Sequence, residues 1–343
     1  MSKPSYVLVT GGAGYIGAHT AVELALAGFE PVLIDNLSRS NERLLKGIAD
    51  VLGRQLIFHR GDCRDEKFLE DVFAKYPIAG VLHFAAFKAV GESVQQPELY
   101  YNNNLNSTLT LVRVMARVGV KPFVVSSSCT VYGEPDHIPV DESAPLKRAE
   151  SPYGATKQMS ERILEDEANT GRLRVISLRY FNPIGAHPSA RLGELPIGEP
   201  SNLVPYVTQA AAGKRKSLTV FGNDYPTPDG SCIRDFIHVV DLAKAHVVAL
   251  QLLLSHSVAE AFQAINLGTG QGVSVLELIN TFVRVTGVAV PFTIGPRRPG
   301  DVVKTYADVK RARERLKWQC EYSLDDALRH AWAWEQQLIH STP

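Results

Sequence analysis

A glycine-rich segment directly after the first apolar strand constrains the fold of this chain more than any other feature. The segment GGAGYIG at 11–17 follows an apolar run at 6–10 and opens a helical pattern. Small residues let the backbone turn sharply and approach a pyrophosphate, and the helix N-terminus presents free N–H groups to it. A side chain at Gly14 would fill the space of the phosphate. The segment therefore predicts a dinucleotide site with contacts at Gly11, Gly14, Tyr15, Ile16 and Gly17.

Short apolar runs alternate with helical patterns through the first half of the chain, which predicts a parallel sheet with helices on both faces. Pro- and Gly-rich connections then break this rhythm, and helical patterns return at 239–254, 275–285 and 324–338. We expect an α/β fold with a Rossmann-type doubly wound sheet in residues 1–181. A smaller mixed α/β lobe would follow in 182–343, with some later segments packing back on the first. The expected strands span residues 6–10, 31–35, 56–59, 80–84, 122–128 and 173–179.

The end of the second strand bears on the choice of cofactor. Asp35 stands there, and its carboxylate can accept hydrogen bonds from both hydroxyls of an adenosine ribose and would repel a 2′-phosphate. This residue favours NAD over NADP. Arg39 and Arg43 follow closely, and a basic residue in this region is how the phosphorylated cofactor is accommodated, so NADP stays open as the alternative.

A tyrosine and a lysine four residues apart form the candidate catalytic pair. Tyr153 and Lys157 are separated by one helical turn, so both project from one face of a helix that Ser151 and a proline would begin. A phenol in water holds its proton until about pH 10. We expect the ammonium, with an oxidised nicotinamide, to lower the pKa of Tyr153 until it acts as a base. The apolar strand before Ser126 ends at Ser128, whose hydroxyl can bond the reacting oxygen.

Composition excludes several classes of protein. Thirty-six basic residues balance thirty-six acidic ones, so no overall field attracts nucleic acid or an anionic membrane. The four cysteines are far apart and contain no C-x-x-C pair, so we expect neither a metal site nor a disulfide framework. We find no signal-peptide pattern and no membrane-spanning run, and we expect a cytoplasmic protein. The basic stretch at 310–317 is interpreted as a solvated helix face.

With these parts assembled, the chain resembles the extended short-chain dehydrogenase/reductase family over essentially its full length, and within it the sugar-nucleotide 4-epimerases. In the first lobe the resemblance lies in VTGGAGYIG at 9–17, HFAAFKAVGES at 83–93, SSSCTVYG at 126–133 and RYFNP at 179–183. In the second lobe it lies in NL at 202–203, FGND at 221–224, RD at 234–235 and RPGD at 298–301. The resemblance also implies a homodimer.

The resemblance implies which residues hold the two ligands, NAD and a UDP-sugar. Asp62 and Cys63 would flank the adenine, and Phe181 would lie near the nicotinamide. Arg234 and Arg298 would supply the positive charge that the substrate's pyrophosphate needs. The other implied cofactor positions are Asn36, Phe84, Ala85, Ala86, Phe87, Lys88, Asn103 and Ser126, with Tyr153 and Lys157. The other implied substrate positions are Asn182, Asn202, Leu203, Thr219, Phe221 and Asp301, with Ser128 and Tyr153.

The implied reaction interconverts UDP-glucose and UDP-galactose by inversion at sugar carbon 4. Tyr153 would take the proton of the 4-hydroxyl as hydride leaves carbon 4 for NAD, and the transient 4-keto sugar would turn over before hydride returns. Some family members place a bulky tyrosine on the wall of the sugar pocket. Counting from Asp301, that position falls on Thr305, with Tyr306 beside it, so we expect UDP-N-acetylglucosamine and UDP-N-acetylgalactosamine to fit as well.

Two other functions share parts of this pattern. A sugar-nucleotide 4,6-dehydratase or decarboxylase has the same fold, cofactor and Tyr/Lys pair. Such dehydratases carry an Asp-Glu pair just after the serine-ended strand, where this chain has Cys129 and Thr130. A regulatory NAD-binding module without catalysis is the second alternative; modules of that kind typically lack the tyrosine or the lysine, and both are present here.

Overall fold

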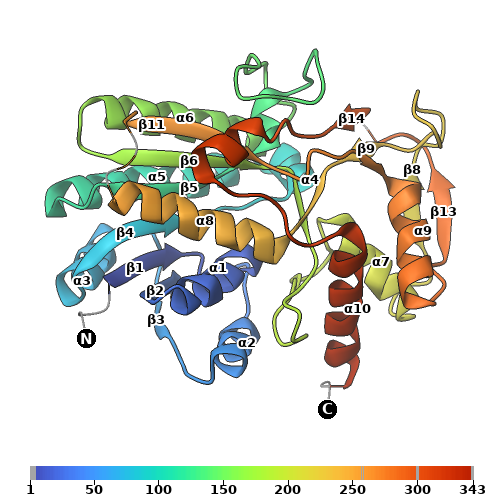
Figure 1. The fold of residues 1–343 in the computed structure, drawn as a ribbon, viewed down its shortest axis with the longest axis horizontal. Coiled ribbons are helices and arrows are strands. Elements are labelled where there is room, and N and C mark those ends of the chain that lie inside the picture. Colours follow the sequence, from blue (N-terminus) through green and yellow to red (C-terminus); the bar gives the residue numbers. More distant parts are fainter. Residues whose placement is uncertain (1–4, 256, 258, 299–300, 341–343) are drawn as a thin grey trace.

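The computed structural model describes residues 5–340 except 256, 258, 299 and 300, so Pro299 and Gly300 of the RPGD motif lie outside the described residues. Figure 1 shows two lobes side by side. The larger lobe contains β1 (Ser5–Thr10), α1 (Tyr15–Leu26), β2 (Phe29–Asp35), α2 (Glu42–Leu52), β3 (Ile57–Arg60), α3 (Glu66–Lys75), β4 (Ile78–His83), α4 (Val90–Gln95), α5 (Pro97–Val118), β5 (Pro122–Ser128), α6 (Pro152–Asn169), β6 (Arg174–Tyr180), α8 (Val239–Leu254) and β11 (Phe262–Leu267). The smaller lobe contains β7 (Asn182–Ile184), α7 (Leu203–Ala211), β8 (Leu218–Phe221), β9 (Ile233–Arg234), β10 (Phe236–His238), β12 (Val273–Ser274), α9 (Val275–Thr286), β13 (Phe292–Gly295), β14 (Lys304–Thr305) and α10 (Leu324–His340).

Seven parallel strands form the sheet of the larger lobe, in the order β11-β6-β5-β4-β1-β2-β3. This arrangement confirms the predicted doubly wound α/β fold. The strands β2 and β3 lie on one side of β1, and β4, β5 and β6 lie on the other, so the winding reverses between β1 and β4. Ligands of open α/β sheets bind in the crevice at such a point, outside the carboxyl ends of the strands.

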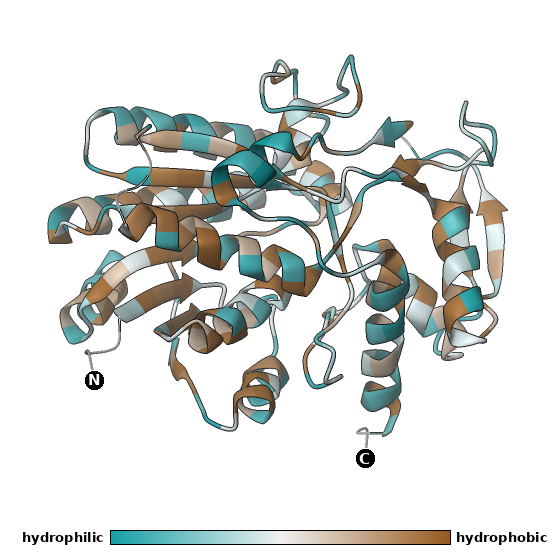
Figure 2. Ribbon diagram, in the orientation of Figure 1, coloured by the Kyte–Doolittle hydropathy of each residue, from teal (hydrophilic) through white to brown (hydrophobic). Residues whose placement is uncertain are grey.

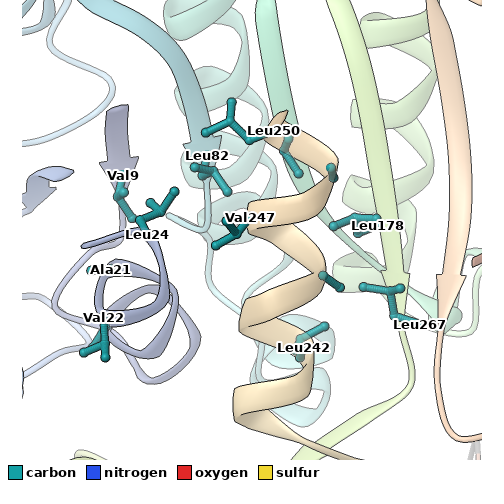
Figure 3. Close-up of a cluster of buried hydrophobic side chains, with 14 of the residues drawn as sticks. Val9, Ala21, Val22, Leu24, Leu82, Leu178, Leu242, Val247, Leu250 and Leu267 are labelled. Atoms are coloured by element: carbon teal, nitrogen blue, oxygen red, sulfur yellow. The ribbon is translucent and has the colours of Figure 1, made fainter. Parts of the chain in front are cut away.

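Side chains of the sheet alternate between two helical layers. Val9 of β1 belongs to the cluster under α1 and α8, whereas the preceding residue, Leu8, belongs to the cluster under α3, α5 and α6. Figure 3 shows Val247 and Leu250 of α8 in one cluster with Leu24 of α1. Because both faces are covered, the strands are hydrophobic along most of their length, as Figure 2 shows.

Two elements of the larger lobe come from the second half of the chain. β11 pairs in parallel with β6, from Phe262 opposite Val175 to Leu267 opposite Tyr180. α8 packs against α1 and against β4, β5 and β6. The chain therefore crosses between the lobes more than once, and this ties the smaller lobe to the edge of the large sheet.

The smaller lobe is built from short pieces. Its sheets have the orders β10-β7, β12-β9-β14 and β13-β8, and its core contains Leu278 and Phe282 of α9 and Leu328 of α10. The basic stretch at 310–317 includes a π-helical turn, Ala312–Leu316, which packs back on α8 and β11 of the larger lobe. Its two end residues are buried and the arginines between them are exposed, as predicted. In the described part of the chain, we find no helix with the length and apolar character needed to cross a membrane.

Candidate active site

The glycine-rich loop leaves open space at the N-terminus of α1. Gly14 is the residue before the helix, and among the described residues no side chain caps this end. A Cβ added at Gly14 would meet one atom within 4 Å in the described structure, the carbonyl oxygen of Gly11 at 3.1 Å, whereas a Cβ at Gly17 would lie 2.2 Å from that oxygen. Gly17 is thus required for close packing, while a side chain at Gly14 would enter the crevice. This is the cradle that a pyrophosphate requires.

A cavity at the crevice brings together eleven of the expected cofactor positions. Gly11, with φ +69°, lies so close to the loop after β4 that an added Cβ would be 2.8 Å from the nitrogen of Ala85. Four further residues at this site, Ser38, Ser40, Gly61 and Ser107, were not predicted, although three of them lie in loops at strand ends. The cavity is lined by Gly11, Gly14, Asp35, Asn36, Ser38, Arg39, Ser40, Gly61, Asp62, Cys63, Phe84, Ala85, Ala86, Phe87, Asn103 and Ser107.

Asp35 joins two loops at the end of this cavity where the adenosine ribose is expected. Its Oδ2 accepts from the Ala13 amide at 3.1 Å, and its Oδ1 accepts from the Leu37 amide at 2.9 Å and the Ser40 hydroxyl at 2.7 Å. Nearby, Asp62 accepts from the Asn36 amide nitrogen at 3.0 Å and pairs with Arg64. The hydrogen bond from Arg64 is the main reason that the pKa of Asp62 is lowered to about 2. The Asp62 carboxylate is therefore ionised at neutral pH.

Eight of the expected cofactor contacts do not line this cavity, and three of them, Tyr15, Ile16 and Phe181, have other partners. The Tyr15 hydroxyl donates to the carbonyl of Gly185 at 2.6 Å, which links α1 to the smaller lobe. Ile16 packs against the core cluster under α1. Phe181 is buried with Val131 and Tyr132 in a small cluster behind the end of β5.

The start of α6 carries the candidate catalytic residues to the end of β5. Ser151 accepts a hydrogen bond from the Gly154 amide at 3.1 Å, so the predicted start of this helix is confirmed. A Cβ added at Gly154 would lie 3.2 Å from the Thr130 carbonyl oxygen, so a glycine lets the helix approach the 3-10 turn Cys129–Tyr132. Ser128 ends β5, and a hydrogen bond from its hydroxyl affects the pKa of Tyr153. The serine and the tyrosine are thus neighbours.

Burial decides the ionisation of the Tyr153 and Lys157 pair. The Lys157 ammonium donates to the carbonyl of Ser126 at 2.6 Å and lies 5.8 Å from the centre of the Tyr153 ring. Burial lowers the pKa of Lys157 to about 8, and the charge of Glu161 acts in the opposite direction. Burial raises the pKa of Tyr153 to about 12, against the hydrogen bond of Ser128. Among the protein groups, burial of the phenol outweighs the hydrogen bond of Ser128. The expected lowering of the Tyr153 pKa also needs the positive charge of an oxidised nicotinamide, so it stays a prediction.

An unpredicted carboxylate joins two of the expected ligand positions. Glu194 accepts from the Lys88 ammonium at 3.1 Å and from the Asn202 amide nitrogen at 2.7 Å, both at Oε1. Lys88 follows β4 in the larger lobe, and Asn202 precedes α7, which Leu203 begins. This carboxylate therefore bridges the two lobes, 106 residues from Lys88 along the chain.

Two arginines among the expected substrate positions of the smaller lobe meet at the carboxylate of a third expected position. Asp301 lies 2.6 Å from the Arg298 guanidinium and 3.6 Å from that of Arg234. Arg298 also lies 5.6 Å from the centre of the Phe221 ring, which shares the exposed face of β8 with Thr219. We call these five residues the arginine cluster.

Two further expected positions lie beside the arginine cluster. Thr305 of β14 is opposite Arg234 in the parallel pairing with β9. Asn182 donates from its side chain to the carbonyl of Asp235 at 3.1 Å, next to Arg234. Cys129 connects this region with the catalytic end: burial raises its pKa to about 11, the Arg234 guanidinium acts against that rise, and Cys129 itself influences Tyr153. Cys129 therefore lies near both Tyr153 and Arg234 of the arginine cluster.

Comparison with known proteins gives a consistent result. Residues 8–331 match the family described as GDP-mannose 4,6 dehydratase. The UDP-glucose 4-epimerase of Bacillus subtilis is 48% identical over 97% of this chain and 98% of its own length. A UDP-glucose 4-epimerase from Stenotrophomonas maltophila, solved with bound NAD and formylated UDP-arabinopyranose, superposes with a TM-score of 0.95 at 45% identity, covering 99% of this chain and 100% of that one.

A second solved structure supports the same grouping. The UDP-glucose 4-epimerase of Bifidobacterium longum, in complex with NAD⁺ and UDP, has a TM-score of 0.93 at 44% identity, with 98% of this chain and 100% of that one covered. Identity at this level over nearly full length shows common descent and a common fold. The chain therefore belongs to the UDP-glucose 4-epimerase family, within the NAD-dependent epimerase/dehydratase group of extended short-chain dehydrogenases/reductases.

Proposed function

We propose that this chain is an NAD-dependent UDP-sugar 4-epimerase that interconverts UDP-glucose and UDP-galactose. One observation carries the proposal: Tyr153, Ser128 and Lys157 meet at the carboxyl end of β5, beside a crevice into which a side chain at Gly14 would project. Arg234 of the arginine cluster lies near Cys129, the residue directly after Ser128. Acid–base residues, a dinucleotide cradle and a cationic site for a nucleoside diphosphate are the three parts that such a reaction needs.

The fit of the residues to NAD rests on the glycine loop and Asp35. The space beside Gly14 suits a pyrophosphate, and Asp35 keeps its carboxylate at the ribose end of the cavity. Bound NAD supplies reversible hydride transfer at sugar carbon 4 and a positive charge that lowers the pKa of a nearby phenol. Asn36, Asp62, Cys63 and Asn103 would line the adenosine half of the cofactor.

Tyr153 would exchange a proton with the oxygen on sugar carbon 4. In one direction its phenolate accepts the proton of the hydroxyl, and in the return step its hydroxyl gives the proton back. Ser128 would hold the same oxygen through a hydrogen bond. Lys157, anchored by the carbonyl of Ser126, keeps a positive charge beside the phenol at neutral pH because its pKa is about 8. Arg234 and Arg298 would hold the diphosphate and leave the hexose free to turn over.

The dehydratase alternative shares the family but lacks its elimination chemistry. A dehydratase needs an acid that protonates the leaving group and a base that removes a proton next to the keto carbon. The turn after β5 holds Cys129 and Thr130 in place of two carboxyl groups, and the thiol is neutral at pH 7 because burial raises its pKa to about 11. These residues favour epimerisation.

We also propose that the sugar pocket accepts 2-acetamido sugars. Thr305, the position expected for a bulky gate, is a small residue opposite Arg234, and the ring of Tyr306 packs against Gly272, where an added Cβ would lie 2.8 Å from it. Successive residues of an extended segment point to opposite sides, so the bulky neighbour is directed away from the side that Thr305 faces. Space for an acetamido group would follow.

One incubation tests the reaction and the sugar range together. Purified protein is given UDP-galactose or UDP-N-acetylgalactosamine without added NAD, and the products are separated by chromatography. UDP-glucose and UDP-N-acetylglucosamine are the expected products. A 4-keto-6-deoxy sugar would instead identify a dehydratase, and an unchanged substrate would contradict the proposed function.

Replacement of the gate residue tests the sugar range alone. Thr305→Tyr should abolish conversion of UDP-N-acetylgalactosamine and leave conversion of UDP-galactose within about 2-fold, because a phenol ring at this position fills the volume of the acetamido group. Thr305→Ser is the matched control and should convert both. If the unmodified protein does not convert UDP-N-acetylgalactosamine, the gate proposal is wrong and the epimerase proposal is unaffected.

We propose in addition that the chain forms a homodimer. α5 and α6 pack side by side on one outer layer of the large sheet, and they expose Leu109, Val118 and Met159. Sedimentation equilibrium should give twice the chain mass, and a monomer at micromolar concentration would exclude this assembly.

A further inference from the structure

A guanidinium that lines the cofactor cavity is already paired with a carboxylate outside it. The Nη2 atom of Arg39 lies 2.7 Å from Oε1 of Glu92, and the guanidinium carbon lies 4.8 Å from the centre of the Phe87 ring. Arg39 and Phe87 line the cavity beside Asp35. Glu92 belongs to α4 and is 53 residues away along the chain. The ion pair and the ring together hold the flat guanidinium at the rim of the cavity.

Arg39 is the arginine that bears on the choice between NAD and NADP. The phosphorylated cofactor adds a 2′-phosphate at the ribose, where a nearby arginine is the usual partner. Arg43, the other arginine considered for this role, has its guanidinium carbon 5.8 Å from the Trp334 ring of α10 and is absent from the described cavity lining. Asp35 repels a phosphate at the same end, so the charge that Arg39 presents decides how strong that discrimination is.

The carboxylate of Glu92 is held in place independently of Arg39. The buried Tyr100 hydroxyl donates to Oε2 of Glu92 at 2.7 Å and accepts from the Ala89 amide at 3.1 Å. The hydrogen bond from Tyr100, followed by that from Arg39, lowers the pKa of Glu92, so this carboxylate is ionised at neutral pH. Glu92 is therefore a fixed anion that neutralises the Arg39 guanidinium.

We propose that Glu92 is a specificity-determining residue for the cofactor, which strengthens the preference for NAD over NADP by neutralising and holding Arg39. The inference rests on the proposed cofactor site. Three carboxylates lie near the ribose end of the site: Asp35, Asp62 and Glu92. Asp62 pairs with Arg64 and Glu92 pairs with Arg39, so this end is negative overall. Removal of the Glu92 charge frees Arg39 to meet a 2′-phosphate.

Cofactor content of the purified full-length chain tests this directly. The unmodified protein, Glu92→Gln, Arg39→Ala and the double variant are expressed in one host, and the nucleotides released on acid denaturation are separated and counted. Glu92→Gln should raise the NADP-to-NAD ratio about 5-fold, the size expected for one partly exposed charge pair. The same change in the Arg39→Ala background should leave the ratio unchanged, because Glu92 acts through that side chain. Thermal shifts with added NADP should follow the same order.

Two comparisons separate the possible failures. Tyr100→Phe removes a hydrogen bond to Glu92 and keeps its charge, so a ratio within about 2-fold of the unmodified protein is expected. A rise equal to that of Glu92→Gln would mean that loosened packing is responsible and would overturn the proposal. An unchanged ratio in Glu92→Gln, or a rise that persists in the Arg39→Ala background, would also overturn the proposal.

Asp35→Ala tests the cofactor site itself and should raise the NADP-to-NAD ratio more than Glu92→Gln does. If Asp35→Ala changes neither the ratio nor the NAD content, the proposed cofactor site is wrong.

Discussion

The two lobes hold their site residues in different ways. In the larger lobe the proposed acid–base and ribose-binding groups are nearly buried, with Ser128, Lys157 and Asp35 each 8% exposed. In the smaller lobe the Arg298 side chain is 59% exposed and Phe221 is 42% exposed. Groups that take part in bond making must be held in one geometry, whereas groups that recognise a substrate can order themselves when it arrives.

The architecture explains this difference. The seven-stranded sheet is covered on both faces, so the loops at its carboxyl edge start from fixed points, and their polar groups are satisfied by partners such as the carboxylate of Asp35. The smaller lobe presents its residues from sheets of two or three short strands. Mutations in the first lobe should therefore act on kcat or stability, and mutations in the second should act on KM.

The largest expected effect is the loss of the phenol. Tyr153→Phe should lower kcat by about 10³-fold and leave KM for UDP-galactose within about 2-fold, because a proton-transfer group contributes mainly in the transition state. Steady-state kinetics measure both values, and the unfolding midpoint serves as the control. A kcat close to that of the unmodified protein would remove Tyr153 from the proposed mechanism.

The buried pair below the catalytic residues should dominate stability in the same lobe. Arg179 donates to both oxygens of Glu161, at 2.7 Å from Nη2 and at 3.0 Å from Nε, and both side chains are at most 6% exposed. Glu161→Gln leaves a buried guanidinium without its charge partner, so it should lower the free energy of unfolding by about 3 kcal/mol in urea denaturation. Asp136→Asn, which breaks a surface pair with Lys147, is the control and should leave the midpoint unchanged. Equal effects of the two variants would contradict this contrast.

In the smaller lobe the expected effect moves to KM. Arg298→Ala should raise KM for UDP-galactose about 10-fold and change kcat less than 2-fold, since it removes a charged hydrogen bond to the diphosphate that is present throughout the reaction. Arg297→Ala is the matched control, because Arg297 pairs with Asp224 and lies over the Tyr225 ring, so it should change KM less than 2-fold. If the two variants behave alike, Arg298 has no special place in the substrate site.

The smallest expected effect is the dependence of the rate on pH. Lys157 has a lowered pKa of about 8 and carries its charge below that value, so the rate should fall by about half between pH 7 and pH 8 and continue to fall above it. Lys157→Arg retains a positive charge at every pH in this range and should give a slower but flat profile. If the rate of the unmodified enzyme stays constant up to pH 10, the charge of Lys157 does not contribute to the reaction.

Most of the fold could be predicted from local pattern. β5 and α8 have the predicted bounds, and the other predicted strands agree within two residues at each end. β11 was not predicted, since polar Gln263 and Asn266 interrupt its apolar run. Asn266 is buried there because its side chain accepts from the Tyr132 hydroxyl at 2.7 Å and donates to the Val140 carbonyl at 2.9 Å. Those partners are 134 and 126 residues away, beyond the reach of a local pattern.

The site could be predicted where its residues form compact motifs. The glycine loop and the Tyr153 and Lys157 pair each lie within seven residues, and a strand or helix gives them a definite direction. Asn104 was missed, although it ties the loop after β4 to the start of α6 by bonding both the backbone of Phe87 and the Thr156 hydroxyl. A run of three asparagines in a helical pattern carries no signal for such a role.

The sequence by itself determined the parallel sheet, the cradle at Gly14 and the spacing of the phenol and the ammonium, because backbone sterics and side-chain periodicity act over a few residues. Only the tertiary structure decided the ionisation of Tyr153, the pairing of Arg39 with Glu92, and the bridge that Glu194 makes between Lys88 and Asn202. Desolvation and Coulomb interactions depend on distance in space rather than along the chain, so they are set only when the lobes and their loops have come together.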